Sequence, residues 1–359
     1  MLALLKRQDW WLSGVVFALL LASSLMLYSI NTELFTAQLA WTILSVLLIF
    51  MFSLIDWRTL IAYRWIILGI YFFSIFLLAF AYIFAPVIRH TREWLVLGPL
   101  QFQVSEFAKL ALIIFLAYYF SRRHVGIARL ANITRSFIYF LIPTLFIFFQ
   151  PDLGTVMIFF GIWAGFLLVS GLKLKHIGIG FLIIAIVVGV FWFGVLKAYQ
   201  KQRIIGLFEP TYDPLGVNYS TIQSKIAIGS GGFFGKGFKQ GTQVQLGFLP
   251  EPGTDYIFSA FMEEWGLLGG LIIIALFTAM IFFIIRIGLY ADTNFYRFFC
   301  LGAVLMLIIQ FAINLGSALG LLPVIGIPLP FFSYGGSSLL INAVIIGIIQ
   351  SSVVYRSLS

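Results

Sequence analysis

The sequence predicts an all-α polytopic membrane protein with about ten transmembrane helices and one large extracytoplasmic loop. Hydrophobic residues make up 62% of the 359 positions and charged residues only 10%, a composition too apolar for a water-soluble fold. Uncharged runs such as 10–32, 65–88 and 153–172 approach or exceed the roughly 20 apolar residues that cross a hydrocarbon core. We therefore expect a single transmembrane domain over residues 1–359.

Hydrophobic runs and the residues that interrupt them locate the helices in order. The fourth has weaker apolar character because Glu106 and Lys109 lie near its start, and Pro151 with Asp152 is expected to stop the fifth early and leave it short. The predicted ranges are 10–31, 35–55, 64–86, 105–121, 136–150, 153–171, 176–196, 256–286, 297–317 and 335–354. An even number of spans puts both termini on one side.

The distribution of lysine and arginine predicts which side is cytoplasmic. If the termini are inside, the short outer segments carry only Arg89, Arg92 and Lys109. The inner segments then carry Lys6, Arg7, Arg58, Arg64, Arg122, Arg123, Arg129, Arg135, Lys173, Lys175, Arg286, Arg297 and Arg356. Because short cytoplasmic loops hold the excess of basic residues, we expect both termini in the cytoplasm and 197–255 outside. The net charge of +9 suits anionic membrane lipids, and no nucleic acid is expected as a partner.

The long outer segment, 197–255, is polar and rich in glycine. Within it, 219–228 is predicted to form a short amphipathic helix that Ser220 or Thr221 would cap. The apolar face of that helix would consist of Ile222, Ile226 and Ala227.

A second feature of the same segment is the alternation of Gly235, Gly237 and Gly241 with Lys236 and Lys239. Backbone N–H groups in such a loop can cradle an anion with help from the two ammonium groups. A flexible turn with solvated lysines explains the pattern equally well, so both interpretations stay open.

Asp255 stands at the start of the predicted eighth helix. Pro250, Pro252 and Gly253 exclude a helix before Thr254, which places Asp255 at the mouth of the eighth helix near the outer membrane face. Asp255 or Thr254 could simply cap this helix, or Asp255 could act as a general base. Glu263 and Glu264 follow about two turns later, at a depth where an ionisable side chain faces a cavity or a partner.

Other polar groups within the predicted spans suggest an outward-facing cavity. Glu106 and Lys109 lie one turn apart and form either a mutually neutralised pair or part of a site in which Lys109 meets a substrate phosphate or sugar. Asp152 is expected to cap a helix. Three prolines and several glycines in 321–336 prevent a continuous helix, so this stretch is expected to form an irregular, re-entrant wall over the cavity.

Motifs of several enzyme classes are missing from the sequence. We find no Walker motif, dinucleotide fingerprint or nucleophile elbow, and the three histidines lack metal-ligand spacing. Cys300 is the single cysteine. No resident metal or cofactor is indicated, although a divalent cation could assist the chemistry.

Taken together, the motifs resemble those of the SEDS family of bacterial cell-wall polymerases, over nearly the whole chain. The fragments that carry the resemblance are Trp94, Ser105–Leu110, Phe149–Thr155, Asp213–Gly216, Gln223–Gly232, Phe248–Glu251, Thr254–Asp255 and the run ending in Ser333–Ser338. Gly235–Gly237 and Gly241–Gln243 are more like the RodA branch, which serves cell elongation, than the FtsW branch. Val104 departs from the family, which commonly has proline there.

This resemblance implies a peptidoglycan glycosyltransferase that polymerises lipid II at the outer face of the bacterial cytoplasmic membrane. Asp255 matches the family's essential aspartate and would be the base. The expected substrate-binding residues are Trp94, Glu106, Lys109, Arg203, Lys236 and Lys239. The expected partners are lipid II, membrane lipids and a class B penicillin-binding protein that supplies transpeptidase activity.

Two other functions fit a ten-helix protein with polar groups in the membrane. A lipid II flippase would carry the same substrate across the bilayer, but the sequence lacks paired broken helices and a coupling-ion site. A non-catalytic scaffold for the penicillin-binding protein is the other alternative. Formation of polymer in detergent separates the enzyme from both.

Overall fold

The computed structural model describes residues 6–88, 91–98, 100–123, 130–169, 198–209 and 212–356, with position 4 and a few isolated positions in 171–194. In this part of the chain, eight helices are long and apolar enough to cross a membrane. The protein is a multi-pass membrane protein, as predicted. The spanning helices are α2 (Trp10–Ile30), α3 (Thr32–Ser53), α5 (Arg64–Phe84), α6 (Val104–Ser121), α7 (Leu130–Phe149), α13 (Ile257–Leu289), α14 (Asn294–Ala318) and α15 (Gly336–Val354).

Shorter elements complete the described fold. The helix α8 (Leu153–Val169) is apolar but shorter than the other spans. The remaining helices are α4 (Trp57–Ala62), α10 (Ala198–Phe208), α11 (Tyr219–Ser230) and α12 (Thr242–Gln245). Each predicted span is found except 176–196, which lies outside the described residues. The fifth predicted helix is not short: α7 begins at Leu130 and has 20 residues, because the polar residues at its start are compatible with helix.

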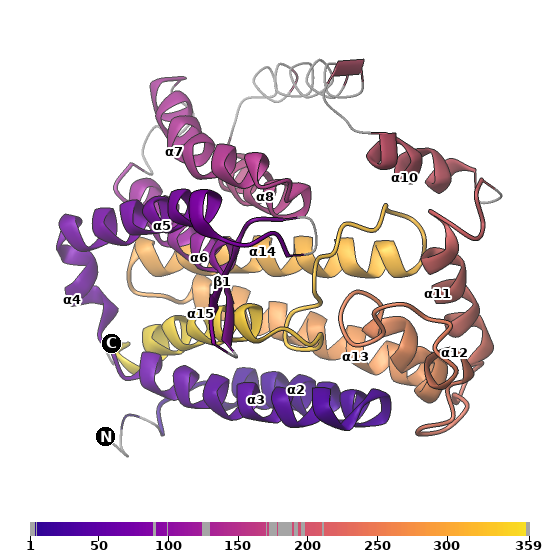
Figure 1. Ribbon diagram of the computed structural model, residues 1–359. Coiled ribbons are helices and arrows are strands. Elements are labelled where there is room, and N and C mark those ends of the chain that lie inside the picture. The colour runs from indigo at the N-terminus through magenta and orange to yellow at the C-terminus, as the bar shows by residue number, and fades with distance from the viewer. Residues whose placement is uncertain are drawn as a thin grey trace.

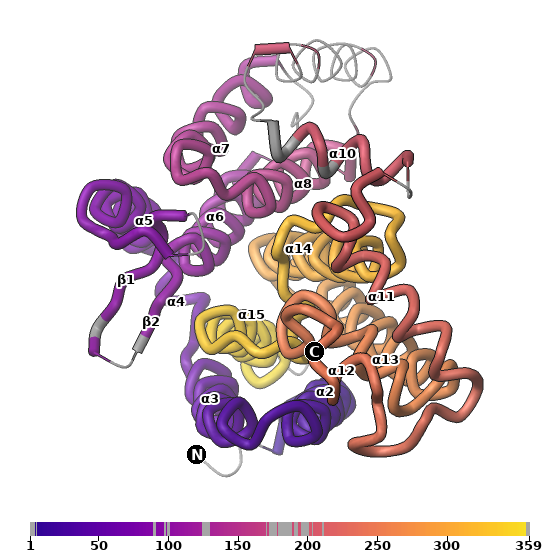
Figure 2. The backbone as a smooth tube through the Cα atoms, turned by 45° about the vertical axis from the view of Figure 1, so that its right-hand side comes forward, coloured from indigo at the N-terminus to yellow at the C-terminus, as the bar shows by residue number. Residues whose placement is uncertain are grey.

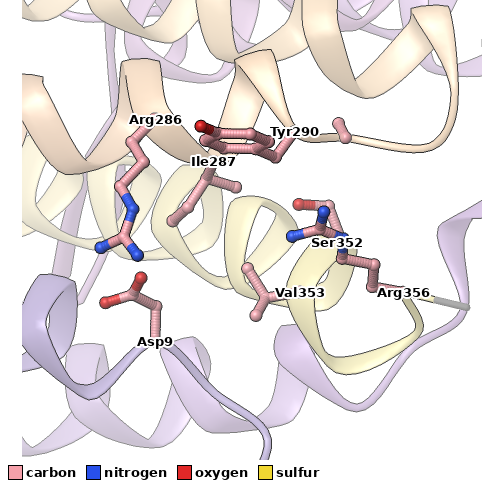
Figure 3. Close-up of a pocket in the computed structure, with 8 residues that line it drawn as sticks. Asp9, Arg286, Ile287, Tyr290, Ser352, Val353 and Arg356 are labelled. Carbon is pink, nitrogen blue, oxygen red and sulfur yellow. The ribbon is translucent and has the colours of Figure 1, made fainter. Parts of the chain in front are cut away.

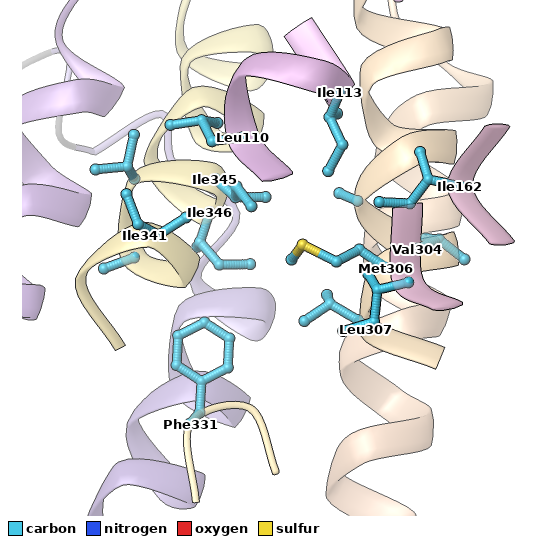
Figure 4. Close-up of a cluster of buried hydrophobic side chains, with 14 of the residues drawn as sticks. Leu110, Ile113, Ile162, Val304, Met306, Leu307, Phe331, Ile341, Ile345 and Ile346 are labelled. Atoms are coloured by element: carbon cyan, nitrogen blue, oxygen red, sulfur yellow. The ribbon is translucent and has the colours of Figure 1, made fainter. Parts of the chain in front are cut away.

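The bundle has two distinct ends. Figure 1 shows both termini at one end, which we call the termini end, and α11 and α12 at the opposite end, which we call the loop end. The helices α6 and α15 form the centre of the bundle. Within the most apolar 18-residue stretch of each helix, 83% of the residues of α6 and 89% of those of α15 are buried, against 17% for α3. Figure 2 shows α15 between α3 and α14. Side chains of α6, α14 and α15 interlock there in an aliphatic core (Figure 4).

A small hairpin was not predicted. Strands β1 (Trp94–Leu97) and β2 (Leu100–Gln103) pair antiparallel, with Trp94 opposite Gln103. The turn contains Gly98 at a φ of 63°, a conformation that glycine adopts without the penalty of a Cβ atom. The hairpin runs directly into α6 and so fixes where that helix begins.

The helix α13 is bent inside the bundle. Gly266 has a φ of 69° and a ψ of −168°, which interrupts the helix. The bend is a contact point, because a Cβ atom on Gly266 would lie 2.3 Å from the backbone nitrogen of Gly235 and 2.4 Å from the carbonyl oxygen of Phe233. The segment 233–237 therefore packs backbone to backbone on α13, which only glycine permits.

The helix predicted at 219–228 exists, but its N-cap differs from expectation. Asn218 occupies the N-cap position, and no side chain forms a cap hydrogen bond there. Of the residues predicted to share the apolar face, Ala227 is buried and Ile226 is 44% exposed, and the polar Ser224 is buried. The Ser224 hydroxyl donates to the Ala318 carbonyl (2.6 Å) and lies 2.7 Å from the Ser259 hydroxyl. These tertiary hydrogen bonds, which helical periodicity does not reveal, orient the helix.

Candidate functional site

Asp255 lies at the loop end, one residue before the N-cap of α13. The N-cap residue is Tyr256, without a side-chain cap hydrogen bond. The Thr254 hydroxyl contacts the Glu251 carboxylate instead, at 3.0 Å. Neither Thr254 nor Asp255 occupies the N-cap position of α13. Asp255 is half-buried in the tight turn that precedes the helix.

The irregular segment 319–335 folds against this turn. Three consecutive carbonyl oxygens each accept a hydrogen bond: that of Gly253 from the Tyr334 N–H (2.8 Å), that of Thr254 from the Ser333 hydroxyl (2.6 Å), and that of Asp255 from the side-chain amide of Asn314 (3.1 Å). The carboxylate of Asp255 faces Gly326, where a Cβ atom would lie 3.9 Å from Oδ2. The segment predicted to form a wall thus packs against the Asp255 turn through Ser333 and Tyr334.

Glu106 and Lys109 form a buried ion pair on α6. Their side chains are almost fully enclosed, and Nζ of Lys109 lies 2.7 Å from Oε1 of Glu106. The Ser337 hydroxyl, at the start of α15, accepts from the Gln103 N–H (3.0 Å) and donates to the Gln101 carbonyl (3.2 Å). Ser337 comes directly after the segment 319–335, which packs against the Asp255 turn. The residues just before α6 and the Asp255 turn are therefore both hydrogen-bonded to the stretch 333–337.

Trp94 begins β1 and is partly buried. Its backbone pairing with Gln103 secures the residue just before α6. The structure therefore gives Trp94 a part in fixing the position of the helix that carries the ion pair.

A buried glutamate beside Trp94 escaped the sequence analysis. Glu93 is 3% exposed and accepts a hydrogen bond of 2.7 Å from the Ser105 hydroxyl. Burial, with a further contribution from the neighbouring Asp152 carboxylate, raises the pKa of Glu93 to about 8, although the hydrogen bond from Ser105 opposes the shift. The carboxylate of Asp152 also caps α8, accepting from the Thr155 N–H at 2.9 Å, as predicted. The sequence around Glu93 does not indicate that this residue is buried, because its hydrogen-bond partner Ser105 lies 12 residues further along the chain.

The anion cradle predicted around 235–241 does not form. The N–H of Lys236 donates to the Glu263 carbonyl and that of Gly237 to the Glu264 carbonyl, both at 3.0 Å. The Lys236 ammonium lies 2.6 Å from the Glu263 carboxylate and 2.7 Å from the Thr242 hydroxyl. Lys236 thus neutralises a fully buried glutamate, and its charge is already engaged within the protein.

Glu264 and Lys239 complete this anchoring of the outer segment to α13. The Ser29 hydroxyl donates to the Glu264 carboxylate. The Lys239 ammonium is exposed and lies 4.0 Å from the centroid of the Tyr28 ring, a cation–π contact that leaves part of its surface open. Of the two lysines, Lys239 keeps more freedom to meet a ligand.

A small open groove lies between the helices α10 and α11 and the 319–335 segment. Lys225 lies along it, together with Asn218 and Thr221, and Leu322, Pro323 and Val324 supply apolar lining. Gly206 of α10 borders the same groove. Arg203, one turn earlier on α10, has a side chain outside the described residues.

A second hollow, of about 410 Å³, lies far from Asp255. Its lining residues come from the start of α2 and the ends of α13 and α15, including Asp9, Arg286, Tyr290 and Arg356 (Figure 3). This is the termini end of the bundle, so the hollow is separate from the candidate site. Among the residues that the structure describes, no three His, Cys, Asp or Glu side chains gather to hold a metal ion.

Comparison with known proteins decides the family. The model of the FtsW, RodA and SpoVE family, described as cell cycle protein, matches residues 8–357. The chain belongs to this family. Peptidoglycan glycosyltransferase MrdB of Escherichia coli K12 is 40% identical over 291 residues, 80% of this chain and 78% of the relative. Stage V sporulation protein E of Bacillus subtilis is 36% identical over 334 residues, 90% and 88% of the two chains.

Solved structures agree with this membership in the SEDS family. A chain of a peptidoglycan synthase complex, described as coordinating polymerization and crosslinking, matches with a TM-score of 0.83 at 31% identity, covering 98% of this chain and 99% of that one. The rod-shape-determining protein RodA of Thermus thermophilus matches with a TM-score of 0.73 at 28% identity and 98% coverage of both chains. The resemblance inferred from the motifs, including that to RodA, is confirmed.

Proposed function

We propose that this SEDS protein is a peptidoglycan glycosyltransferase that polymerises lipid II into glycan strands, with Asp255 as the general base. The observation that carries the proposal is a half-buried aspartate in the turn before α13, where Tyr334, Ser333 and Asn314 hold three consecutive backbone carbonyls. Relatives named peptidoglycan glycosyltransferase support the reaction class.

The reaction needs a base, a stabilised leaving group and room for lipid chains. Asp255 removes the proton from the acceptor sugar hydroxyl. The oxygen of that hydroxyl attacks the anomeric carbon of the donor at the same time. The bond from that carbon to the phosphate oxygen breaks, and the electron pair leaves with the undecaprenyl pyrophosphate. General base catalysis typically contributes about 10²–10⁴-fold in rate, and cationic side chains near the leaving group supply the electrostatic part.

The basic side chains expected to bind the pyrophosphate differ in whether their charge is already paired within the protein. Lys236 is bound to Glu263, so we assign it to holding the outer segment. Lys109 is likewise paired, with Glu106, and would meet the pyrophosphate only together with that carboxylate. Lys239 is the exposed candidate, and Arg203 stays a candidate from the sequence. The groove that α10 and 322–324 share would receive the lipid-linked end of a substrate, because it joins apolar lining to the segment that faces Asp255.

We further propose that both termini are cytoplasmic and that the loop end faces outward, from the distribution of lysine and arginine. Lipid II then reaches Asp255 from the outer leaflet. We expect a class B penicillin-binding protein as partner, and a role in cell elongation by similarity to RodA and MrdB.

The test is polymerisation by purified protein. Protein with its transpeptidase partner is given lipid II in detergent, and glycan strands are resolved by gel. Wild type should form strands, Asp255→Ala should form none, and the control Glu33→Gln, an exposed change on α3, should behave as wild type. Polymer without a second compartment excludes flipping and scaffolding. A folded Asp255→Ala variant that polymerises normally would remove Asp255 from the mechanism.

A further inference from the structure

The inference concerns the three backbone carbonyls of Gly253, Thr254 and Asp255. The turn precedes α13, so these carbonyls need donors from elsewhere if they are to be held in one orientation. They receive them from two residues of one segment, Tyr334 and Ser333, and from Asn314 on α14. We call this set of hydrogen bonds the carbonyl frame.

Asn314 is the member that acts on Asp255 itself. Its side chain is 2% exposed, and its amide nitrogen donates both to the Asp255 carbonyl (3.1 Å) and to the Ile327 carbonyl (2.9 Å). Ile327 follows Gly326, the residue that faces the Asp255 carboxylate. One amide group therefore fixes the aspartate and the backbone in front of it relative to each other. Among neutral side chains, only those of asparagine and glutamine carry an NH2 group, which supplies two N–H donors from one nitrogen.

Ser333 links the frame to the turn that builds it. Its hydroxyl donates to the Thr254 carbonyl and accepts from the Leu329 N–H at 2.9 Å. Phe331, inside this turn, has a φ of 60°, a strained conformation for a residue with a side chain. The N–H groups of Phe332 and Ser333 also donate to the Leu329 carbonyl (3.1 and 2.9 Å), so several hydrogen bonds together hold this strained turn.

We propose that Asn314 and Ser333 are positioning residues for Asp255, acting through its backbone and not by touching the substrate. This rests on the proposed function, with Asp255 as the base. A shift of the turn by about 1 Å is enough to lower a rate by about 100-fold. Loss of the frame should therefore reduce kcat while leaving KM for lipid II nearly unchanged, since the hydrogen bonds that define the frame join backbone and side-chain groups other than the groove side chains that would bind the lipid-linked end.

The experiment compares Asn314→Ala with Gln310→Ala, a matched control. Gln310 lies one turn earlier on α14, is fully buried, and neither atom of its amide group has a hydrogen-bond partner within the described structure. We expect Asn314→Ala to lower kcat at least about 10-fold with KM within about twofold, and Gln310→Ala to keep wild-type kcat. Asn314→Asp should be worse than Asn314→Ala, because a carboxylate would face two carbonyl oxygens.

Ser333 keeps the proposal testable if Asn314→Ala does not fold. Ser333→Ala should lower kcat, and Ser333→Thr, which keeps the hydroxyl, should restore most of it. Wild-type kcat in Asn314→Ala or in Ser333→Ala, or an equal loss in Ser333→Ala and Ser333→Thr, would overturn the frame. If wild type itself makes no polymer, the proposed function fails instead, so the two failures are distinguishable.

Discussion

The pKa of Glu93 predicts how the stability of this protein depends on pH. The pKa is raised from 4.5 to about 8, through burial and the neighbouring Asp152, so the folded state holds a proton that the unfolded state releases. Stability from this group is complete below pH 4.5 and is lost as the pH rises toward 8. A difference of about 3.5 pH units at roughly 1.4 kcal/mol each amounts to a loss of about 5 kcal/mol in the free energy of unfolding.

Glu93→Gln should abolish this dependence. Glutamine has nearly the shape of the protonated acid and cannot ionise, so the variant should keep at pH 9 the contribution that wild type loses. For large domains, a change of 1 kcal/mol in the free energy of unfolding shifts the melting temperature by about 2 °C. The melting temperature of the variant should therefore exceed that of wild type by about 10 °C at pH 9, and by almost nothing at pH 4.5.

The assay is thermal unfolding in a non-ionic detergent, followed by tryptophan fluorescence from pH 4.5 to 9. Glu33→Gln is the control, because Glu33 is exposed in the first turn of α3 and should leave the wild-type pH dependence in place. Parallel pH curves for wild type and Glu93→Gln would refute the reasoning, since they would mean that Glu93 releases its proton at the same pH in both states.

Three further predictions test the ion pairs and the bend. Lys109→Met leaves the Glu106 carboxylate buried without its partner and should lower the free energy of unfolding by about 3–5 kcal/mol. The double variant with Glu106→Gln should recover this stability in thermal unfolding. If the double variant still polymerises poorly, Lys109 contributes its charge to the reaction. Lys236→Met should cost about 3 kcal/mol, and less when combined with Glu263→Gln; additive losses in a double-mutant cycle would mean that the pair does not interact. Gly266→Ala should lower the melting temperature through backbone clashes that cost about 3 kcal/mol or more, whereas an unchanged value would show that the bend is not needed.

The span pattern follows from local chemistry. Runs of apolar residues between charges or prolines define helices whether or not their neighbours are known, so the predicted ranges agree closely with α2, α5, α14 and α15. The hairpin that ends at Gln103 was missed because strands this short carry little periodic signal, and their pairing is favoured by the tertiary position of Ser337.

The roles of the lysines could not be read from the sequence. The alternation of Lys236 with glycines suggested anion binding, but a glutamate 27 residues away pairs with it. Ile226 and Ala227 were predicted to share an apolar face, but Ala227 is buried and Ile226 is exposed, since Ser224 makes the tertiary hydrogen bonds that set the rotation of α11. In both cases, the local pattern is correct and the choice among its interpretations depends on a distant partner.

The sequence by itself determined that this chain spans a membrane many times and that Asp255 lies at a helix mouth, because hydrophobicity and helix-breaking residues act over short distances along the chain. Only the tertiary structure decided what holds Asp255. Its carbonyl meets Asn314, 59 residues away, and the neighbouring Thr254 carbonyl meets Ser333, 79 residues away. Such contacts exist only when the helices pack, since hydrogen bonds depend on distances in space that spacing along the chain does not specify.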